Sequence, residues 1–581
     1  MKIISRIYNK TVLAATVALG ALATSCTDYL TIIPADVVVE ENFWQTKDQV
    51  NGVLATSYLK LLSRDAVTKA IIWGELRSDN MTYNPNYNTD IKNIIEANII
   101  DENGYCNWSI FYEAINYANL VLESAADVVD RDPDFSEGDL QVVQGEMLAL
   151  RALCHFYLVR TFRDIPLALK SAKNDAEIPE YVQAHPLEAL DLIMADLDRA
   201  ENMVMISGAF SSPQQNYGRI TRNAVLAIKA DVNLWRAAFS TYYAGTEYKL
   251  VHTEGNPTVS VKDANQYYDA CIENCTQVLA YMDEKIEKKD TENPFNLILN
   301  RGLASALKES RKSTAYDEIF GSKNSSESIF ELQVQGDNIK NEQFNGAYRV
   351  YGSEGTPGLV VVPQNFVTSH YQEDDLRAYS YFTNISPDDF KEGAKPSENS
   401  ICVAKYASKE SPATGFRSSG EWDANWIIYR RTDVMLMKAE ALVRRAATNN
   451  KDVIAAFDIV NAINTRSRMN SKDIKNPLKV ESYTSGKESI VELVKEERLR
   501  ELSYEGKRWY DLVRQALIDK ETKNIKFVAD RLGSIAPVVK IKMNSIDALF
   551  LPIYVEELRY NTNLKQNPAY DKKDDTSIDM N

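Results

Sequence analysis

The sequence predicts a mostly α-helical protein with one loop-rich, strand-poor region in its second half. Apolar residues recur every three or four positions between Gln144 and Leu167, and again between Arg222 and Ser240. That spacing lays an apolar stripe along one side of a helix. From about residue 296 to 425 the periodicity stops, and segments rich in Gly and Asn, such as NEQFNGAYRVYGSEGTPG, take its place. We therefore expect a helical scaffold that carries long ordered loops.

The run from Gln144 to Leu167 is expected to be a core helix. Its stripe is formed by Met147, Leu150, Cys154 and Leu158. Arg151 and Arg160 fall among these positions, so at least one guanidinium lies near the core and needs a partner there. Pro166 has no amide hydrogen and restricts the residue before it, so we expect the helix to end here with Ile165 extended.

Further helices are expected on both sides of the loop-rich region. Thr46 is a good N-cap for one near the N-terminus. Helical spacing also continues through residues 186–203, 271–282, 429–445 and 453–463. Helix pairs of this length suggest TPR-like packing, although no clean 34-residue repeat is present.

The charge-rich stretch EERLRELSYEGKRWYDLVR, from Glu496 to Arg514, also reads as helix. Its opposite charges lie three and four residues apart. This pattern indicates ion pairs within and between helices rather than a catalytic acid–base cluster.

The loop-rich region contains one clear strand pattern. Apolar and polar residues alternate in Ser328–Val334, which is typical of a half-buried strand. The loops around it are long, and loops of that length are uncommon unless they serve a function. A second non-helical stretch, WGELRSDNMTYNPNYNTD, runs from Trp73 to Asp90 and has the composition of exposed turns.

The N-terminus has the features of an export signal. Two Lys and one Arg in the first ten residues precede an apolar run, Val12 to Ala23, that is too short to span a bilayer. The run leads directly to Cys26, as at sites where a lipoprotein is cut and lipidated. We expect a signal peptide over residues 1–25 and lipid on Cys26. Ordinary secretory cleavage is the alternative, and Ala23 stands where such sites usually have Leu.

Composition argues against several classes of function. The formal net charge of −16 disfavours nucleic acid, which requires a basic surface. The four His are scattered, and the chain has no HExxH, CxxC, GxSxG or phosphate-binding glycine motif. We therefore expect no enzymatic activity, no cofactor and no bound metal. Of the cysteines, Cys154 is expected to be a buried thiol, and Cys271 and Cys275 to be structural.

Three segments carry a resemblance to a known family. RALCHFYLVRTFRDIPL, EERLRELSYEGKRWYDLVR and the closing LPIYVEELRYNTNLKQNPAY are similar to signatures of the SusD/RagB family, the nutrient-binding outer-membrane lipoproteins of Bacteroidetes. Asp375, Leu376 and Arg377 resemble the family's Asp-Pro-Arg element, with leucine in place of the proline. The resemblance covers essentially the whole mature chain. It implies a SusD-like fold with helix pairs stacked as a scaffold, and a SusC-like TonB-dependent transporter as partner.

The expected organisation follows from this resemblance. An N-terminal SusD-like helical part covers residues 26–295, a loop-rich insertion with short strands covers 296–425, and a C-terminal SusD/RagB helical part covers 426–581. Residues 26–581 are expected to form one compact unit. A palmitate-bearing Cys26 would hold that unit at the outer membrane, facing the cell surface.

Two loops contain the mixture of side chains that a carbohydrate site needs. Aromatic rings stack on sugar C–H faces, while amides, carboxylates and guanidinium groups pair with hydroxyls. The candidate ligand-binding residues are Arg77, Asp79, Asn80, Tyr83 and Tyr87 in the first loop, and Asn341, Tyr348 and Tyr351 in the second. We expect the two loops to converge on one face of the scaffold. The alternative is that these are turn residues and core-anchoring tyrosines, and Trp73 itself is expected in the core.

These features indicate a cell-surface protein that binds a nutrient oligosaccharide and delivers it to the transporter. A surface-anchored glycan hydrolase is one alternative, but no acid pair stands out among 82 acidic residues. A purely structural helical-repeat adaptor is another, which the long polar and aromatic loops disfavour. Some members of the family serve peptides rather than glycans, and the sequence does not distinguish these ligands.

Overall fold

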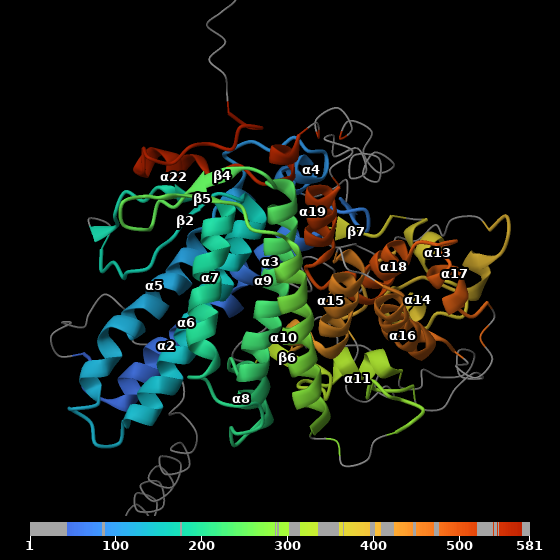
Figure 1. The fold of residues 1–581 in the computed structure, drawn as a ribbon, viewed down its shortest axis with the longest axis horizontal. Coiled ribbons are helices and arrows are strands. Elements are labelled where there is room, and N and C mark those ends of the chain that lie inside the picture. Colours follow the sequence, from blue (N-terminus) through green and yellow to red (C-terminus); the bar gives the residue numbers. More distant parts are fainter. Residues whose placement is uncertain are drawn as a thin grey trace, which may run out of the picture.

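The computed structural model shows helices packed side by side in a row, with short strands and loops around them (Figure 1). The part of the chain that the structure describes comprises residues 43–83, 88–174, 177–284, 286, 290–300, 314–334, 360–363, 365–394, 401–407, 423–445, 449–469, 474, 476–519, 539, 543 and 545–571.

Helices dominate the described residues, which confirms the predicted class. Those of the first half are α2 (Lys47–Leu62), α3 (Arg64–Ile71), η2 (Ile72–Leu76), α4 (Thr89–Ile95), η3 (Gly104–Cys106), α5 (Ser109–Ser124), η4 (Ala125–Val128), α6 (Glu137–Phe162), α7 (Pro186–Glu201), α8 (Pro213–Gly218), α9 (Arg222–Tyr242) and α10 (Asn265–Glu284). Those of the second half are α11 (Ala315–Gly321), α13 (Phe366–His370), α14 (Arg377–Ser380), η6 (Pro387–Phe390), α15 (Arg431–Arg444), α16 (Asn450–Ser467), α17 (Val480–Thr484), α18 (Ile490–Leu502), α19 (Arg508–Ile518), η8 (Ile546–Leu549) and α22 (Val555–Tyr560).

Successive long helices are neighbours in space, as expected for stacked helix pairs. α2 packs on α5, α5 on α6, α6 on α7, α7 on α9 and α9 on α10 (Figure 1). The row continues through α10 onto α15, which packs on α16 and α18. Thr46 caps α2 as predicted, because its side chain accepts a hydrogen bond from the Gln49 amide.

The core helix α6 is covered on all sides rather than along one stripe. Every residue from Gly145 to Phe162 is buried. Among the described helices, α6 alone is long and apolar enough to cross a membrane. However, 89% of its most apolar 18-residue stretch is buried inside the protein, as in the core helix of a globular fold. The chain leaves α6 through Ile165 and Pro166, which form the short strand β2, so the predicted end of the helix is confirmed.

Both arginines of α6 have the partners that their burial requires. Arg151 forms a bidentate pair with Asp196 (2.8 and 2.7 Å), and Arg160 donates to Asp231 (3.2 Å). The Arg160 guanidinium also lies over the Tyr510 ring, 4.4 Å from its centroid. These contacts connect α6 to α7, α9 and α19.

The described strands form four two-stranded antiparallel sheets. They are β1 (Thr82–Tyr83) with β7 (Val360–Val361), β2 (Ile165–Pro166) with β3 (Gln183–Ala184), β4 (Glu247–Lys249) with β5 (Thr258–Ser260), and β6 (Ser328–Leu332) with β8 (Trp426–Arg430). The strand predicted near Ser328 is therefore present. It is buried on both faces and not half-buried, because its polar side chains also find interior partners: Glu331, for example, accepts a hydrogen bond from Asn425 (2.8 Å).

The main hydrophobic core joins residues from both halves of the chain. It includes α2, α5, α6 and α9 from the first half together with β8 and α19 from the second. A second cluster lies between α15, α16 and α18. Cys154 is a buried thiol, as predicted, and Cys271 and Cys275 are buried with their Sγ atoms 4.0 Å apart.

Candidate functional site

The first predicted loop begins as a continuation of a helix. α3 runs directly into η2, a π-helical turn that carries Trp73. The Trp73 side chain is buried, stacks on Phe111 and donates from its indole Nε1 to the Tyr105 carbonyl oxygen (2.8 Å). The prediction that Trp73 belongs to the core is confirmed.

Arg77 and Asn80 are buried as well, so the prediction of an exposed loop at these residues is wrong. Arg77 donates to the carbonyl oxygens of Ala548 (2.5 Å) and Leu549 (2.8 Å). Asn80 donates from its amide nitrogen to the carboxylate of Glu75 (2.7 Å). Turn-like composition suggested exposure, but distant segments cover both residues. The carbonyl groups that bind Arg77 lie 471 and 472 residues away, and the Tyr504 hydroxyl donates to the Asn80 carbonyl oxygen (2.9 Å) from 424 residues away.

Asp79 completes a clamp, by which we mean the contacts between residues 74–80 and 504–508. Asp79 accepts two parallel hydrogen bonds from Arg508, both 2.8 Å, and its side chain is 9% exposed. The backbones of Gly74 and Gly506 touch: a Cβ on Gly74 would lie 2.0 Å from the Gly506 carbonyl oxygen. Gly506 also has a φ of +72°, which favours glycine. The clamp ties the first candidate loop to the C-terminal signature.

Glu75 is the buried carboxylate at the centre of the clamp. Burial raises its pKa to about 7, although hydrogen bonds from Asn80 and from the Lys507 amide (3.1 Å) oppose that rise. Close to neutral pH this group therefore carries a proton in a substantial fraction of molecules.

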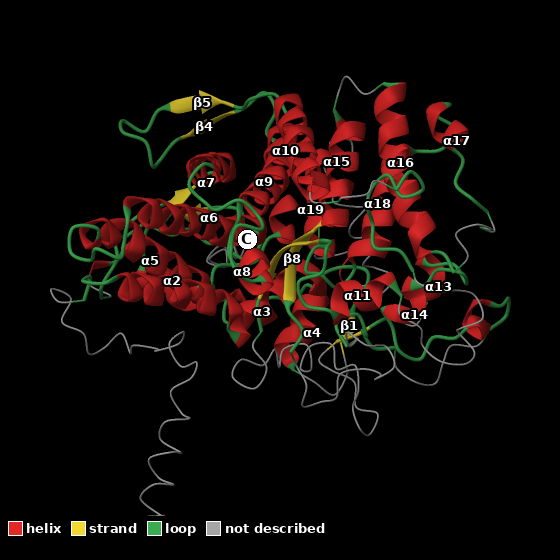
Figure 2. Cartoon of the chain, turned by 90° about the horizontal axis from the view of Figure 1, so that it is seen from below, coloured by secondary structure: helices red, strands yellow, loops and turns green. Residues whose placement is uncertain are grey.

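Tyr83 is the candidate ligand residue that the structure places at the surface. It lies on the short strand β1, which Figure 2 draws near the lower margin of the described fold, and its side chain is half-buried. Its hydroxyl donates to Glu96 (3.1 Å), and the Lys92 ammonium lies 5.7 Å from the ring centroid. Tyr87, and Asn341, Tyr348 and Tyr351 of the second candidate loop, lie outside the described residues.

The stems of the two candidate loops are adjacent. β1 pairs antiparallel with β7, with Tyr83 opposite Val360. In the sequence, β1 ends four residues before Tyr87, and β7 begins nine residues after Tyr351. Two stretches almost 280 residues apart in the chain thus meet at one edge of the fold, which is a contact that local patterns do not contain.

The C-terminal charged stretch forms a buried ion-pair network across helices. α18 ends at Leu502 and α19 begins at Arg508, so the stretch is two helices joined by a tight turn rather than one. Between helices, Arg498 pairs with Asp511 (2.9 Å) and Arg514 with Glu440 (2.8 Å). Within α19, Arg514 also pairs with Asp511 (2.7 Å), so the predicted pairing within and between helices is confirmed.

Glu501 lies at the centre of this network. We call its contacts with Arg466 (2.5 Å), Arg430 (2.8 Å) and Arg377 (3.1 Å) the arginine cluster. Burial alone would raise the pKa of Glu501, but the three guanidinium charges outweigh it and hold the pKa well below its ordinary value. Arg377 also binds Asp375, so the element in which leucine replaces the family's proline still anchors this cluster.

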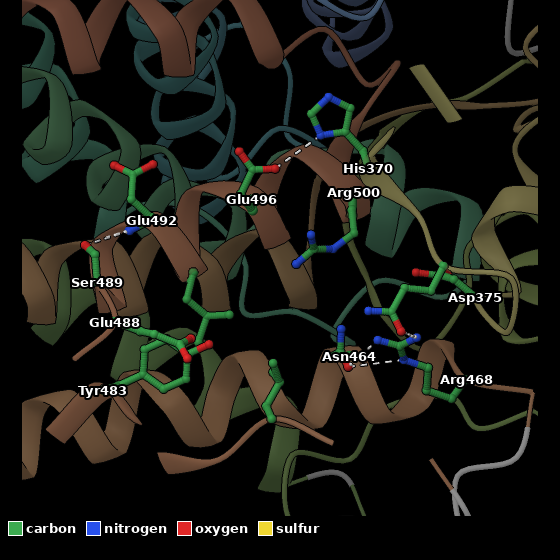
Figure 3. A pocket seen from close by; sticks show the side chains of 13 residues that line it. His370, Asp375, Asn464, Arg468, Tyr483, Glu488, Ser489, Glu492, Glu496 and Arg500 are labelled. Atoms are coloured by element: carbon green, nitrogen blue, oxygen red, sulfur yellow. Dashed lines mark hydrogen bonds and ion pairs between the residues drawn. The ribbon is translucent and has the colours of Figure 1, made fainter. Parts of the chain in front are cut away.

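A separate pocket of about 440 Å³ opens between α16, α17, α18 and the end of α13 (Figure 3). Its walls combine carboxylates, guanidinium groups and a few apolar side chains. The lining residues are His370, Gln372, Asp375, Asn464, Arg468, Leu478, Tyr483, Glu488, Ser489, Glu492, Leu493, Glu496 and Arg500. Among the described residues, no three His, Cys, Asp or Glu side chains are grouped so that they could hold a metal ion.

Sequence reasoning did not single out this pocket as a site. The signal that could have indicated one wall is the helical spacing of Ser489, Glu492, Glu496 and Arg500, which puts polar groups on one face of α18. The opposite wall comes from α16 and α17, and no local pattern pairs these helices with α18.

Comparison with known proteins agrees with this architecture. A family model described as "SusD family" matches residues 333–570, and one described as "Starch-binding associating with outer membrane" matches residues 35–234. SusD-like protein P38 from Formosa agariphila is 24% identical over 95% of this chain and 97% of its own length.

Solved structures share the fold at low sequence identity. A SusD homolog from Bacteroides thetaiotaomicron aligns with a TM-score of 0.64 at 18% identity, covering 91% of this chain and 100% of its own. A SusD superfamily protein from Parabacteroides distasonis aligns with a TM-score of 0.61 at 22% identity, covering 90% and 99%. These structures show that the chain has the SusD fold. The chain belongs to the SusD/RagB family.

Proposed function

We propose that this protein is a lipid-anchored receptor at the cell surface that binds an oligosaccharide and passes it to a SusC-like TonB-dependent transporter. Membership of the SusD/RagB family supports nutrient binding at the outer membrane. The oligosaccharide, the anchor at Cys26 and the transporter partner are the finer parts of the proposal.

The observation that carries the ligand proposal is the β1–β7 pair. Tyr83 offers a half-buried aromatic ring at the molecular edge, directly opposite Val360. We infer that Tyr83 and Tyr87 form one shallow site together with Asn341, Tyr348 and Tyr351. Exposed tyrosine rings suit a strongly hydrated sugar, since they stack on it and lose little conformational entropy. Arg77, Asp79 and Asn80 would act by fixing the start of this loop through the clamp.

Replacing Tyr83 tests the site. Among glycans identified in an array screen, Tyr83→Ala is expected to weaken binding by about 1–2 kcal/mol in calorimetry, while Tyr83→Phe retains most of the affinity because the ring remains. Tyr560→Ala is the matched control, since Tyr560 is 85% exposed on α22. Equal affinities of Tyr83→Ala and the parent for a confirmed glycan would remove Tyr83 from the site.

The anchor, the partner and the absence of catalysis have independent tests. Cys26→Ala should lose labelled fatty acid and leave the membrane fraction, because acyl chains supply the membrane affinity. The parent protein should co-purify with a TonB-dependent transporter from its own membranes. Incubated with its glycan, it should release no reducing ends, and hydrolysis that persists through further purification would favour the hydrolase alternative.

A further inference from the structure

The short helix α4 supports the strand that carries Tyr83. It packs against both β1 and η2, and Figure 2 draws it beside β1. Ile91, Ile94 and Ile95 bury one side of α4. Because β1 has only two residues and pairs with a single described strand, it would hold Tyr83 weakly by itself. Contacts from α4 are therefore needed to fix the Tyr83 ring.

Two side chains of α4 contact Tyr83. Lys92 and Glu96 are four residues apart, which puts them on the same side of the helix. The Glu96 carboxylate accepts a hydrogen bond from the Tyr83 hydroxyl (3.1 Å). The Lys92 ammonium lies over the Tyr83 ring, 5.7 Å from its centroid, which is within the range of a cation–π contact. One contact thus holds the tip of the ring, and the other lies over its face.

These two contacts orient the ring before a ligand arrives. A tyrosine side chain rotates about two bonds, and immobilising a side chain on binding costs affinity. The hydroxyl is at the far end of the side chain, so its bond to Glu96 restricts rotation about the first of these bonds. The ammonium of Lys92 favours one orientation of the ring face, which restricts rotation about the second. The cost of ordering Tyr83 is therefore met within the protein.

Lys92 also marks the side of Tyr83 from which a ligand can approach. Lys92 is exposed whereas Tyr83 is half-buried, so the ring face below the ammonium is the face toward solvent. A ligand that stacks on this face comes within reach of the ammonium, because the four-carbon stem of lysine is flexible. An ammonium donates hydrogen bonds and accepts none, so it selects ligand oxygen atoms that accept them.

We propose that Lys92 and Glu96 complete the ligand site at Tyr83. Glu96 is a positioning residue, which acts through the Tyr83 hydroxyl. Lys92 is a further ligand contact, which donates hydrogen bonds to oxygen atoms of the molecule stacked on the ring. This inference rests on the proposed function, since it requires Tyr83 to belong to the site.

A double-substitution cycle tests the role of Glu96. The probe is the oligosaccharide that the full mature protein binds most tightly on a glycan array, and calorimetry measures its affinity. Glu96→Ala and Tyr83→Phe remove the same hydrogen bond from its two ends, so each should weaken binding about two- to threefold. The double variant should bind no more weakly than either single variant. Glu96→Gln retains an acceptor and should bind like the parent.

Two results would overturn the positioning role of Glu96. One is an unchanged affinity of the Glu96→Ala protein, and the other is a double variant in which the two single effects multiply. Melting temperatures accompany each variant. If Glu96→Ala does not fold, Tyr83→Phe decides, because it breaks the same bond without altering α4, and affinity equal to that of the parent would then contradict the role.

Two substitutions and a protection experiment test Lys92. Lys92→Met keeps an apolar side chain over the ring but has no donors, so it should weaken binding of the same oligosaccharide about three- to tenfold. Lys92→Arg retains the donors and should restore most of the affinity. Lys60→Met is the matched control and should bind like the parent, because the Lys60 ammonium lies 5.6 Å from the Tyr117 ring, between α2 and α5. The bound oligosaccharide should also protect Lys92, but not Lys60, from acetylation by acetic anhydride.

The contact at Lys92 is contradicted if Lys92→Met binds like the parent, or if Lys92 is acetylated equally with and without the oligosaccharide. Tyr83→Ala separates these roles from the proposed site. If Tyr83→Ala weakens binding and the Lys92 and Glu96 variants do not, only the roles of Lys92 and Glu96 are wrong. If Tyr83→Ala binds like the parent, the site lies elsewhere and both the site and these roles are wrong.

Discussion

Glu75 in the clamp and Glu501 in the arginine cluster are both fully buried glutamates, yet their pKa values move in opposite directions. Burial raises the pKa of Glu75 to about 7, against hydrogen bonds from an amide side chain and backbone amides. Burial also acts on Glu501, but the charges of Arg466, Arg430 and Arg377 reverse its effect. Hydrogen bonds from neutral donors therefore do not offset desolvation of a carboxylate here, whereas three guanidinium groups do.

This difference separates two ways of holding distant segments together. The clamp joins residues 74–80 to residues 504–508 by close backbone approach and one bidentate pair, Asp79 with Arg508. The arginine cluster joins α14, β8, α16 and α18 by charge. The clamp depends mainly on close backbone packing and the arginine cluster on charge. Substitutions and changes of pH should therefore affect the two regions differently.

The largest decrease in the free energy of unfolding is expected when Glu501 loses its charge. Glu501→Gln leaves three buried guanidinium groups undercompensated, and breaking a buried ion pair costs about 3–5 kcal/mol. Urea unfolding at pH 7 should show this decrease in the free energy of unfolding. Glu492→Gln on the same helix is the control and should change it by less than about 0.5 kcal/mol, because Glu492 is exposed. A Glu501→Gln protein as stable as the parent would show that the cluster contributes no net charge stabilisation.

The next largest change in the free energy of unfolding should come from the titration of Glu75. Its dependence on pH should be opposite to that of Glu501. Its folded pKa of about 7 lies above its ordinary value of 4.5, so its contribution to stability is fully present below pH 4.5 and is lost as pH rises through 7. The difference in free energy of unfolding between the parent and Glu75→Gln should fall by about 3 kcal/mol from pH 4.5 to pH 8, at 1.36 kcal/mol per pKa unit. For Glu501 the lowered pKa predicts the reverse: its stabilisation is present above pH 4.5 and lost as pH falls. A pH-independent difference for Glu75 would mean that its carboxylate is solvated.

The backbone contact of the clamp should be sensitive to a single methyl group. A Cβ at Gly74 would lie 2.0 Å from the Gly506 carbonyl oxygen, so Gly74→Ala must separate the two backbones and should cost about 2 kcal/mol. Gly52→Ala in α2 is the matched control. No atom lies within 4 Å of its added Cβ, and better helix propensity should stabilise the protein by up to about 1 kcal/mol. Thermal unfolding of the two variants measures the contrast, and equal melting temperatures would show that the contact yields easily.

The smallest decrease in the free energy of unfolding is expected when Asp79 loses its bidentate partner. Arg508→Lys keeps the positive charge but replaces two parallel hydrogen bonds with one, which should cost about 1 kcal/mol in urea unfolding. Arg559→Lys, in the exposed pair with Glu556, should be neutral. A neutral Arg508→Lys would indicate that charge alone holds Asp79 in the clamp.

Local patterns in the sequence were sufficient to predict the helices, but they did not show whether individual polar residues are buried or exposed. The periodicity of α6, its end near Pro166 and the need of Arg151 and Arg160 for partners were all predictable, because each depends on neighbours within a few positions. Exposure of Arg77 and Asn80 was predicted from turn-like composition and is wrong. Composition reports which side chains are polar, and it does not report whether a distant segment covers them.

The sequence by itself determined the helical class, the family resemblance and the charge pairing of the C-terminal signature, since these follow from residue types at short spacing. Only the tertiary structure decided that Asp79 meets Arg508, that Tyr83 lies opposite Val360, and that α16 and α18 line a common pocket. The physical reason is that each of these contacts joins residues separated by tens to hundreds of positions. Such pairings are selected by how helices pack around a shared core, not by the conformational preference of either segment.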